Sequence, residues 1–470
     1  MAELDCDPGE KSEGPASTKS VVLSGEPAPP AYSEDYLAQR FVMAYPQTRY
    51  VAEWSRWMLY QDGRWIQDTK RRVFDMARNI CRTASEEYLM LPKPSDTTAK
   101  QIASARTVAS TLTLASSDQA IAATSDQWDA DHMLLNTPGG TVDLRTGKLR
   151  EHRSEDHLTK LTAVEPAKDY RGMFPVWTQF LDRITASNEE LMRYLQRVCG
   201  YCLTGLTREH AFFFFFGGGA NGKTTLLNVL LGMLGDYGCR ALTETFLEIG
   251  RGVTDRHPTE LAKLRGARLA LASEVSGGTR WNEEKIKDLT GGDRITARFM
   301  RQDFFEFVPQ FKLVITGNHK PTLRNVDEGM RRRMHLVPFT VTIPESERDQ
   351  DLPAKLKAEW PAILRWVIEG CLEWQRQGLN PPAMVRDATK DYFENQDVLG
   401  NWIDECCEVC PQAGPTKSSV LYQSYKQWAE TANERVMSNR KFSEALEERG
   451  FQKRTSQCSV FDGIAVRESR

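Results

Sequence analysis

Apolar residues recur at helical spacing in four stretches of the first 205 residues, with short strand-like stretches between the helical ones. Strand alternation is expected on either side of Asp62-Gly63, a typical hairpin turn, and again within residues 134–162. The helical patterns cover residues 32–42, Val73–Met90, Thr97–Leu114 and residues 177–203. This part of the chain therefore predicts a mainly helical region that carries small antiparallel strands.

After residue 205 the pattern changes to an alternation of buried strands and helices. The apolar run Phe212–Phe216 begins it, and it continues to about Phe339. Such an alternation is typical of an α/β domain with a parallel sheet. Helices predominate to about Gln377, residues 378–382 read as a linker, and the rest predicts three helical segments and a β-like end.

Composition sets the outer limits of these segments. Residues 1–32 are rich in Pro, Ser, Gly and Glu, which favours a disordered tail. The predicted domains are the tail at 1–32, an N-terminal α+β or helical region at 33–205, an α/β core at 206–345, a helical lid and linker at 346–391, and a small C-terminal domain at 392–470.

The bulk composition narrows the class of protein. The chain has 470 residues, of which 40% are hydrophobic and 27% charged. No run reaches the roughly 18 apolar residues of a membrane span, and the acidic N-terminus has no signal-peptide character. We expect a cytoplasmic protein with no membrane partner.

Charge and cysteine content leave two questions open. The net charge of -3 does not exclude DNA, because a few cations from several subunits suffice to line a channel. Among the ten cysteines, Cys199/Cys202 and Cys407/Cys410 form two C-x-x-C pairs. They indicate either free thiols in a reducing compartment or a shared zinc site.

One motif predicts a nucleotide site. Residues 217–224 read Gly-Gly-Gly-Ala-Asn-Gly-Lys-Thr, which fits G-x-x-x-x-G-K-[ST] between a strand and a helix. Backbone amides of such a loop wrap phosphate oxygens, the lysine reaches the β- and γ-phosphates, and the Thr224 hydroxyl ligates Mg²⁺. The predicted ATP-binding residues are Gly217, Gly218, Gly219, Ala220, Asn221, Gly222, Lys223, Thr224 and Thr225.

Two later strands end in polar residues that suit the same chemistry. The strand 268–274 ends in Ser273 and Glu274, and a carboxylate there can orient the attacking water and, with Ser273, support the metal. The strand 311–318 ends in Asn318, where AAA+-type ATPases place a polar residue beside the γ-phosphate. Alone, each strand is ordinary core with a polar cap; their order after the phosphate loop favours the catalytic interpretation.

Three adjacent arginines follow, Arg331, Arg332 and Arg333. Such a cluster is either a solvated or nucleic-acid-facing patch or, in a ring ATPase, the source of an arginine finger that stabilises charge on the γ-phosphate bound by the neighbour. We favour the finger, without assigning it to one arginine.

At this point the chain resembles a known family over residues 129–340: the phage/plasmid primase–helicases, which include the poxvirus primase–helicase and whose core is a superfamily III helicase. The resemblance rests on Leu135-Asn136, Val142–Gly147, Gly200-Tyr201, Leu203–Gly205, Gly219–Thr224, Ser273-Glu274, Lys287, Thr290–Asp293, Arg298, Thr316–Pro321 and Arg332-Arg333. It implies an AAA+-like P-loop ATPase core, a hexameric ring, and tracking on single-stranded DNA, usually 3′ to 5′.

The resemblance also implies DNA-contacting residues. A hairpin of residues 295–300 and 304–308, with residues 301–303 at its tip, would face the DNA. Alternating apolar residues in both arms agree with paired strands, although a plain structural hairpin is the alternative. The DNA-binding residues so implied are Lys287, Arg298, Phe299 and Arg301.

The two ends of the chain complete this hypothesis. The last residues resemble the family's winged-helix-like end, with helices at 420–430 and 442–448, Ser438 as N-cap and a wing at 451–467. Its basic residues Arg440, Lys441, Arg449, Lys453 and Arg454 suit duplex or origin DNA, or a protein partner. Asp129 and Asp131 only superficially resemble a primase carboxylate pair, so we expect no primase domain, and a separate primase or initiator as a partner.

The sequence therefore predicts an ATP- and Mg²⁺-dependent replicative helicase of a phage, prophage or plasmid in a bacterial cell. It would act as a homo-oligomer on single-stranded and forked DNA. The alternatives are an initiator that binds and melts an origin without processive unwinding, and a primase–helicase with cryptic synthesis.

Overall fold

The computed structural model describes residues 28–467 except 170–171, 173, 249–258, 276–277, 302, 324–326, 411–413, 433, 435 and 456–457. The predicted tail at 1–32 thus lies almost wholly outside the described residues. The chain divides into two compact units, Met1–Leu59 with Gln67–Ser125, and Tyr60–Ile66 with Asp126–Arg470. Each unit is described below by itself.

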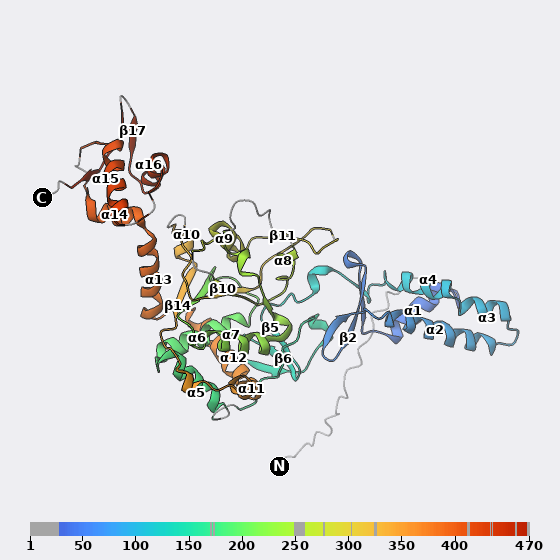
Figure 1. Ribbon diagram of the computed structural model, residues 1–470. Helices are drawn as coiled ribbons and strands as arrows, with labels where there is room; N and C mark the ends of the chain where they lie inside the picture. The colour runs from blue at the N-terminus through green and yellow to red at the C-terminus, as the bar shows by residue number, and fades with distance from the viewer. Residues whose placement is uncertain are drawn as a thin grey trace, which may run out of the picture. The chain divides into compact units, whose positions relative to one another are not determined.

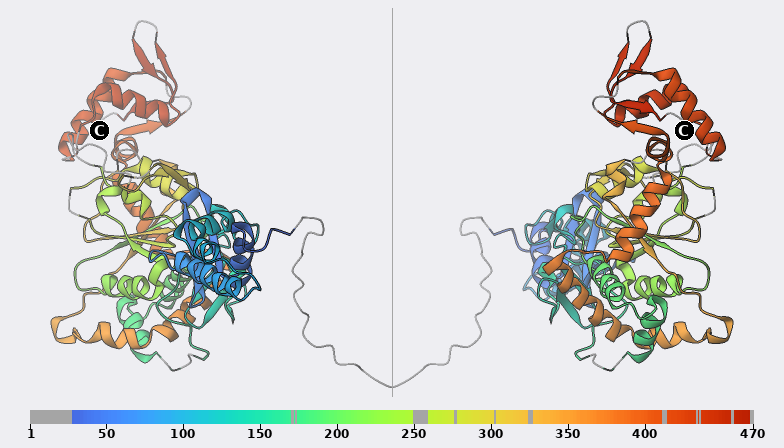
Figure 2. Two further views of the ribbon diagram at one scale, coloured as in Figure 1. Left: turned by 90° about the vertical axis from the view of Figure 1, so that its right-hand side faces the viewer. Right: turned by 90° about the vertical axis from the view of Figure 1, so that its left-hand side faces the viewer.

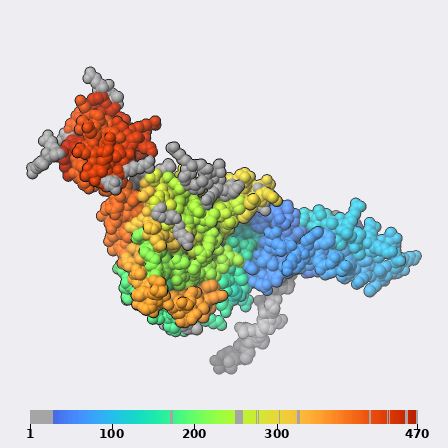
Figure 3. Space-filling model, viewed as in Figure 1, coloured from blue at the N-terminus to red at the C-terminus, as the bar shows by residue number. Residues whose placement is uncertain are grey.

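The first unit is mainly helical, as predicted. Its helices α1, α2 and α4 pack side by side (Figure 1) and bury Leu37, Phe41, Val73 and Val108. The space-filling view shows the surface of this unit in blue and cyan (Figure 3). The helices are α1 (Glu34–Ala44), α2 (Arg72–Leu89), α3 (Asp96–Ile102) and α4 (Ala105–Ala115), and the strands are β1 (Thr48–Val51), β2 (Arg56–Gln61) and β4 (Ala122–Ala123).

Two local predictions concern residues 56–115, of which Tyr60–Ile66 belong to the second unit. The turn between β2 and β3 (Arg64–Gln67) is confirmed, because Asp62 and Gly63 adopt φ values of 50° and 74°. The helical pattern over Thr97–Leu114 is confirmed, and two helices form it. Ser104 accepts a hydrogen bond from the backbone N–H of Thr107 at 3.2 Å, and this N-cap ends α3 and begins α4.

A five-stranded parallel sheet forms the centre of the second unit and confirms the predicted α/β class (Figure 1). Its spatial order is β14 (Met334–Pro338), β8 (Phe212–Phe216), β13 (Lys312–Gly317), β10 (Leu269–Val275) and β9 (Gly238–Arg240). The strand after β8 in sequence, β9, lies at the far edge. Strands β13 and β10, which come later in the sequence, lie between β8 and β9. Because the sheet is parallel, the carboxyl ends of β13 and β10 lie at the same edge of the sheet as the carboxyl end of β8.

Alternating residues of β8 face two different cores. Phe213 and Phe215 belong to a cluster with residues of α5, α6, α7 and α12, whereas Phe212 and Phe214 face a cluster with Trp281. Because successive strand residues point to opposite faces, an all-apolar strand requires cover on both sides. The covering helices are α5 (Pro175–Thr185), α6 (Glu189–Cys202), α7 (Lys223–Leu234) and α12 (Trp360–Gln377) on one face, and α8 (Thr259–Ala262), α9 (Glu283–Gly291), α10 (Glu328–Arg331) and α13 (Ala383–Gln396) on the other (Figure 2).

The remaining elements of this core region connect the sheet to its surroundings. Residues 134–150 form an antiparallel sheet, as predicted, and α9 leads into a two-stranded hairpin. These elements are β5 (Leu134–Thr137), β6 (Gly140–Asp143), β7 (Lys148–Arg150), β11 (Ile295–Ala297), β12 (Phe305–Phe307) and α11 (Leu352–Ala358).

Two buried cations fix α6 against the start of the sheet. Arg268 is 2% exposed and donates to the carbonyls of Leu203 and Leu134 at 2.5 and 2.7 Å. Lys312 is 1% exposed and donates to the carbonyl oxygens of Thr204 and Leu206. Both cations thus satisfy carbonyls beyond the end of α6, where the helix dipole favours positive charge. No local sequence pattern marks either cation as a partner of these carbonyls.

We expect Lys312→Met to change the pH dependence of stability. Burial lowers the pKa of Lys312 from 10.5 to about 7, so between these values the unfolded chain binds more protons than the folded one. The cost of burying this lysine is fully present below pH 7 and disappears as the pH rises toward 10.5. The free energy of unfolding of the wild type should therefore rise relative to that of Lys312→Met, by at most ~1.4 kcal/mol per pH unit.

Urea unfolding of both proteins from pH 7 to pH 10 measures this difference. Lys390→Met, at an exposed position of α13, is the matched control and should follow the wild type. A difference between the wild type and Lys312→Met that stays constant with pH would show that Lys312 does not titrate in this range.

The C-terminal part has its own apolar core, built around Trp402, Tyr425, Phe442 and Phe461. The predicted N-cap is confirmed: Ser438 accepts from the N–H of Lys441 at 3.4 Å and starts α16. Strand β18 pairs with β16 and β17, and β19 pairs with β15. The elements are α14 (Val398–Cys406), β15 (Cys407–Val409), β16 (Thr416–Lys417), α15 (Ser418–Thr431), α16 (Asn439–Glu448), β17 (Lys453–Thr455), β18 (Ser459–Phe461) and β19 (Ile464–Val466).

Within the described ranges, no helix is both long and apolar enough to span a bilayer.

One predicted domain boundary, between residues 391 and 392, falls inside α13, which runs without a break from Ala383 to Gln396. The predicted domain limits otherwise stay a prediction.

Candidate functional site

The glycine-rich loop lies between β8 and α7, at the carboxyl end of the sheet. Gly217 allows close approach of another strand end, because a Cβ there would lie 2.2 Å from the carbonyl oxygen of Phe339. Gly222 adopts a φ of 82° and would place a Cβ 2.3 Å from Ile184. In contrast, a Cβ on Gly218 or Gly219 would meet nothing within 4 Å. The loop is therefore packed at both ends and open over its middle.

Lys223 lies at the centre of this loop and is only 4% exposed. Its ammonium group donates to the carbonyl oxygen of Gly217 at 2.7 Å and to Oδ1 of Asn221 at 2.9 Å. It also lies 3.4 Å from Oδ1 of Asn318. Among the described side chains, which do not include that of Glu274, its acceptors are all neutral oxygens, and burial lowers the pKa of Lys223 to about 8. A buried ammonium held by neutral oxygens alone can gain an anionic partner when phosphate binds.

The loop also has free backbone donors. Helix α7 begins at Lys223, and its N-cap residue, Gly222, provides no side-chain acceptor for the first N–H groups. These amides and the positive end of the helix dipole suit a phosphate group. Thr224 is exposed in the first turn, and Thr225 is half-buried beside it. The residues present therefore fit a nucleotide phosphate with a hard cation, for which a hydroxyl oxygen is a suitable ligand.

The neighbouring strand ends bring further predicted residues to the same edge of the sheet. Asn318 directly follows β13, which pairs with β8 from Phe212 to Phe216. Ser273 and Glu274 lie near the end of β10, where the regular pairing with β13 is interrupted between Ala272 and Val275. The structure describes only the backbone of Glu274, so the predicted role of its carboxylate stays a prediction.

The arginine cluster lies at the opposite end of β8. The N–H of Phe212, the first residue of β8, donates to the carbonyl oxygen of Arg333 at 2.8 Å. Five strand residues at ~3.3 Å each separate this point from the loop by on the order of 16 Å. The arginines therefore lie at the other end of β8 from the phosphate loop of their own chain.

These arginines differ in their surroundings. Arg331 lies over the ring of Phe393 with its guanidinium carbon 5.6 Å from the centroid, and Arg332 is exposed. Arg333 donates to the carbonyl oxygen of Gly329 at 2.9 Å, and its buried Nε finds no hydrogen-bond partner among the described residues. Burial, followed by the charge of Arg332, lowers the pKa of Arg333.

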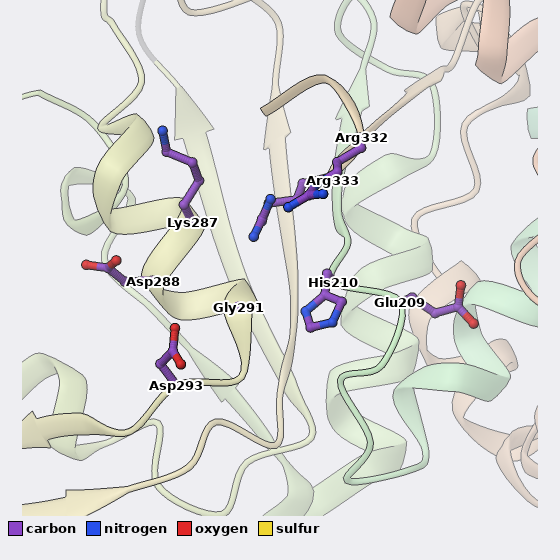
Figure 4. A pocket seen from close by; sticks show the side chains of 8 residues that line it. All are labelled: Glu209, His210, Lys287, Asp288, Gly291, Asp293, Arg332 and Arg333. Atoms are coloured by element: carbon purple, nitrogen blue, oxygen red, sulfur yellow. The ribbon is translucent and has the colours of Figure 1, made fainter. Parts of the chain in front are cut away.

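A charged cavity of about 520 Å³ lies beside this cluster (Figure 4). Its lining residues come from α9 and the connection that follows it, from the segment before β8 and from the segment after α10, and they carry both signs of charge. They are Glu209, His210, Lys287, Asp288, Gly291, Asp293, Arg332 and Arg333. No local motif marks Glu209, His210 or Asp288, and Asp293, although it belongs to the string Thr290–Asp293, was given no role from the sequence.

The structure separates Lys287 from the other predicted DNA-binding residues. Lys287 lies on α9 and forms an ion pair with Asp327, with Nζ 2.9 Å from Oδ2. It lines the same cavity as Arg332 and Arg333. The family resemblance implied a DNA-binding role for Lys287, and nothing local in the sequence indicates a partner 40 residues away.

The predicted hairpin is confirmed, with shorter strands than expected. Ile295 pairs with Phe307 and Ala297 with Phe305, and the paired strands end there. Beyond them, Phe299 stacks on Phe305 at 5.7 Å between centroids, which leaves 37% of Phe299 exposed. Arg298 lies over Phe304 with its guanidinium carbon 4.6 Å from the centroid.

The tip of this hairpin is exposed. Arg301 is exposed and adopts a φ of 61°, which is uncommon for a residue other than glycine. Met300 and Phe304 are 70% and 59% exposed. The hairpin therefore presents apolar side chains and the cation of Arg301 to its surroundings.

Most of the basic residues predicted at the C-terminal end are paired within the chain. Arg440 lies 2.8 Å from Glu444, and Lys453 lies 3.0 Å from Glu447. Arg449 pairs with Asp397, and Arg454 pairs with Asp462. The positive charge available to DNA on this part is therefore smaller than the sequence alone indicates.

Two other candidates from the sequence have structural roles here. Asp129 accepts a hydrogen bond from the N–H of Thr159 at 2.9 Å, and Asp131 pairs with Arg145 at 2.7 Å. Both carboxylates are thus engaged within the fold. Among the described residues, no group of three or more His, Cys, Asp or Glu side chains is placed to hold a metal ion.

Comparisons with known proteins find two matching family models and several viral relatives. Residues 38–186 match the family described as "D5 N terminal like", and residues 215–333 match a family of unknown function, DUF5906. The chain is 27% identical over 328 residues to "Putative helicase L207/L206" of Acanthamoeba polyphaga mimivirus, covering 64% of this chain and 33% of the relative. It is 26% identical over 227 residues to "Putative helicase 022R" of Frog virus 3 (isolate Goorha), covering 44% and 23%.

The chain thus spans a third or less of the length of these two relatives. Among solved structures, the A form apo structure of the NrS-1 C-terminal region has a TM-score of 0.50 at 8% identity, covering 91% of this chain and 98% of the other. That likeness concerns the fold alone. Together, the family and sequence matches confirm the predicted relationship to the primase–helicases of the D5 type.

Proposed function

We propose that this chain is an ATP-dependent, ring-forming DNA helicase that serves replication of a phage, prophage or plasmid. One observation carries the proposal: Lys223 and Asn318 meet at one end of β8, whereas the arginine cluster lies at the other. In an isolated subunit the arginines cannot reach the phosphates held by Lys223. In a ring, they can act on the nucleotide of the next subunit.

The proposed ATPase core is of the AAA+ type and belongs to superfamily III. The loop residues 217–225 bind the triphosphate, and Lys223 and Asn318 contact its terminal phosphates. Thr224, Ser273 and Glu274 hold Mg²⁺, which neutralises charge on the phosphates when bound. Glu274 orients the attacking water, and one of Arg331, Arg332 and Arg333 of the adjacent subunit stabilises the charge that develops on the γ-phosphate.

The proposed DNA path uses the hairpin between β11 and β12. Copies of the hairpin from several subunits surround single-stranded DNA, with Arg298, Phe299 and Arg301 as contacts. We propose a hexamer that tracks 3′ to 5′, and a winged-helix-like C-terminal domain that binds duplex DNA or a partner such as a primase or initiator.

A strand-displacement assay tests this function. With ATP and Mg²⁺, the protein should separate a forked duplex that carries a 3′ single-stranded tail, and far less of one that carries only a 5′ tail. Omission of ATP, or its replacement by a non-hydrolysable analogue, should remove the activity. Melting confined to a few base pairs, independent of duplex length, would favour the alternative, an initiator that binds and opens an origin.

A further inference from the structure

Asp327 connects two elements that the proposed function treats separately. Its Oδ1 accepts a hydrogen bond from the N–H of Met330 at 2.7 Å, which caps the short helix α10. Its Oδ2 accepts from Nζ of Lys287 on α9 at 2.9 Å. Each carboxylate oxygen is therefore committed to a different helix.

On one side, these contacts determine where the arginines lie. Helix α10 ends at Arg331, and Arg332 and Arg333 follow it directly. The carbonyl oxygen of Gly329, inside this helix, accepts from Arg333. A Cβ built on Gly329 would lie 2.9 Å from Oδ1 of Asp327 and 3.3 Å from Cδ of Lys287, so the lysine side chain lies against the helix.

On the other side, Lys287 belongs to the helix that leads into the hairpin. Helix α9 ends at Gly291, and strand β11 begins at Ile295. Ile286 and Leu289 are buried in the core, which fixes the orientation of α9. A displacement of the hairpin base can therefore reach α10 through Lys287 and Asp327.

The exposure of the pair argues against a role in stability alone. Lys287 and Asp327 are both 36% exposed, and ion pairs at such positions contribute little to folding. Lys287 lines the cavity of Figure 4 together with Arg332 and Arg333. Its location thus relates it to the arginines more closely than to the hairpin tip.

We infer that Asp327 is a positioning residue for the arginine cluster, and that its ion pair with Lys287 couples the DNA hairpin to ATP hydrolysis at the adjacent subunit. This inference rests on the proposed function. It assigns Lys287 to communication within the subunit instead of to direct contact with DNA.

Four substitutions separate the two contacts of Asp327. Asp327→Ala removes both, while Asp327→Asn keeps an oxygen that can cap α10 and loses the charge. Lys287→Met removes the ion pair, and Lys287→Arg restores it. Lys285→Met, on the same helix and with the same change of charge, is the matched control.

The expected results concern turnover on single-stranded DNA. Asp327→Ala should lower the DNA-stimulated kcat about tenfold, with the KM for ATP changed less than about twofold, and Asp327→Asn should lie between it and the wild type. Lys287→Met should lose most DNA stimulation yet keep its Kd for single-stranded DNA within about twofold. Lys287→Arg and Lys285→Met should behave like the wild type.

Mixed rings distinguish positioning from misfolding. Asp327→Ala subunits keep an intact phosphate loop, and Lys223→Ala subunits keep an intact arginine cluster. Mixing them should recover hydrolysis, as mixing Arg332→Ala or Arg333→Ala with Lys223→Ala should. If Asp327→Ala subunits misfold, the mixed rings recover no ATP hydrolysis. The inference is then tested by the DNA-stimulated kcat of Asp327→Asn, which keeps the cap of α10.

Three results would overturn the inference. The first is a wild-type kcat in both Asp327 variants. The second is a Lys287→Met variant whose DNA affinity falls tenfold while stimulation of hydrolysis at saturating DNA persists. The third is a Lys285→Met variant that is as impaired as Lys287→Met. Failure of the proposed function has a different result, because the wild type itself would then hydrolyse no ATP or show no stimulation by DNA.

Discussion

Lys223→Ala is expected to lower ATP hydrolysis at least 100-fold and to abolish measurable nucleotide binding. The ammonium group of Lys223 is buried, donates to neutral oxygens of Gly217 and Asn221, and lies at the centre of a loop that is open to solvent over Gly218 and Gly219. Its loss removes the cation that would contact the β- and γ-phosphates. Filter binding with radiolabelled ATP and a phosphate-release assay measure the two effects.

Glu274→Gln is the contrasting variant. It should also abolish hydrolysis, yet keep ATP affinity within a few-fold of the wild type, because the amide retains the shape of the side chain and loses the ability to activate water. Near-normal turnover by Lys223→Ala would remove the assignment of the phosphate loop. Normal turnover by Glu274→Gln would leave the loop assigned and require another residue to orient the water.

Arg301→Ala is expected to reduce single-stranded DNA affinity and unwinding severely. Arg301 is exposed at the tip of the hairpin, and several copies around a channel would neutralise backbone phosphates although the net charge of the chain is -3. Each lost phosphate contact should lower the dependence of log K on log salt by about 0.7 for single strands. ATP hydrolysis measured without DNA should fall far less than unwinding.

Arg301→Lys is the matched control for this prediction. Lysine keeps the charge at the same backbone position, so most DNA affinity and most of the salt dependence should return. Fluorescence anisotropy with a labelled oligonucleotide at several salt concentrations measures both. Unwinding at the wild-type rate by Arg301→Ala would place the DNA contact elsewhere, with the basic C-terminal residues as the next candidates.

Local features of this protein were predictable because each depends on neighbouring residues. The phosphate loop follows from the glycines and Lys223 within eight positions of each other, and the start of α16 follows from Ser438. The pairing of Ile295 with Phe307 follows from the alternation of apolar residues in both arms of the hairpin. The α/β class follows from the alternation of apolar strands with helices after Phe212.

Strand β8 shows both what a local pattern predicts and what it does not. An all-apolar run of five residues predicts a strand covered on both faces, and both faces are indeed buried by separate helical layers. The run does not indicate which helices form each layer. That depends on the order of the strands in space, which no local pattern determines.

The tertiary structure alone decided the contacts that join distant segments. Asn318 reaches Lys223 because β13 is inserted beside β8, and Lys287 meets Asp327 because α9 and α10 pack on the same side of the sheet. Arg268 and Lys312 read as unremarkable polar residues before apolar strands, yet both are fully buried against carbonyls beyond α6. Periodicity predicts which residues are buried together. Strand order and helix packing determine which polar groups meet. Strand order also places the arginine cluster at the far end of β8 from the phosphate loop.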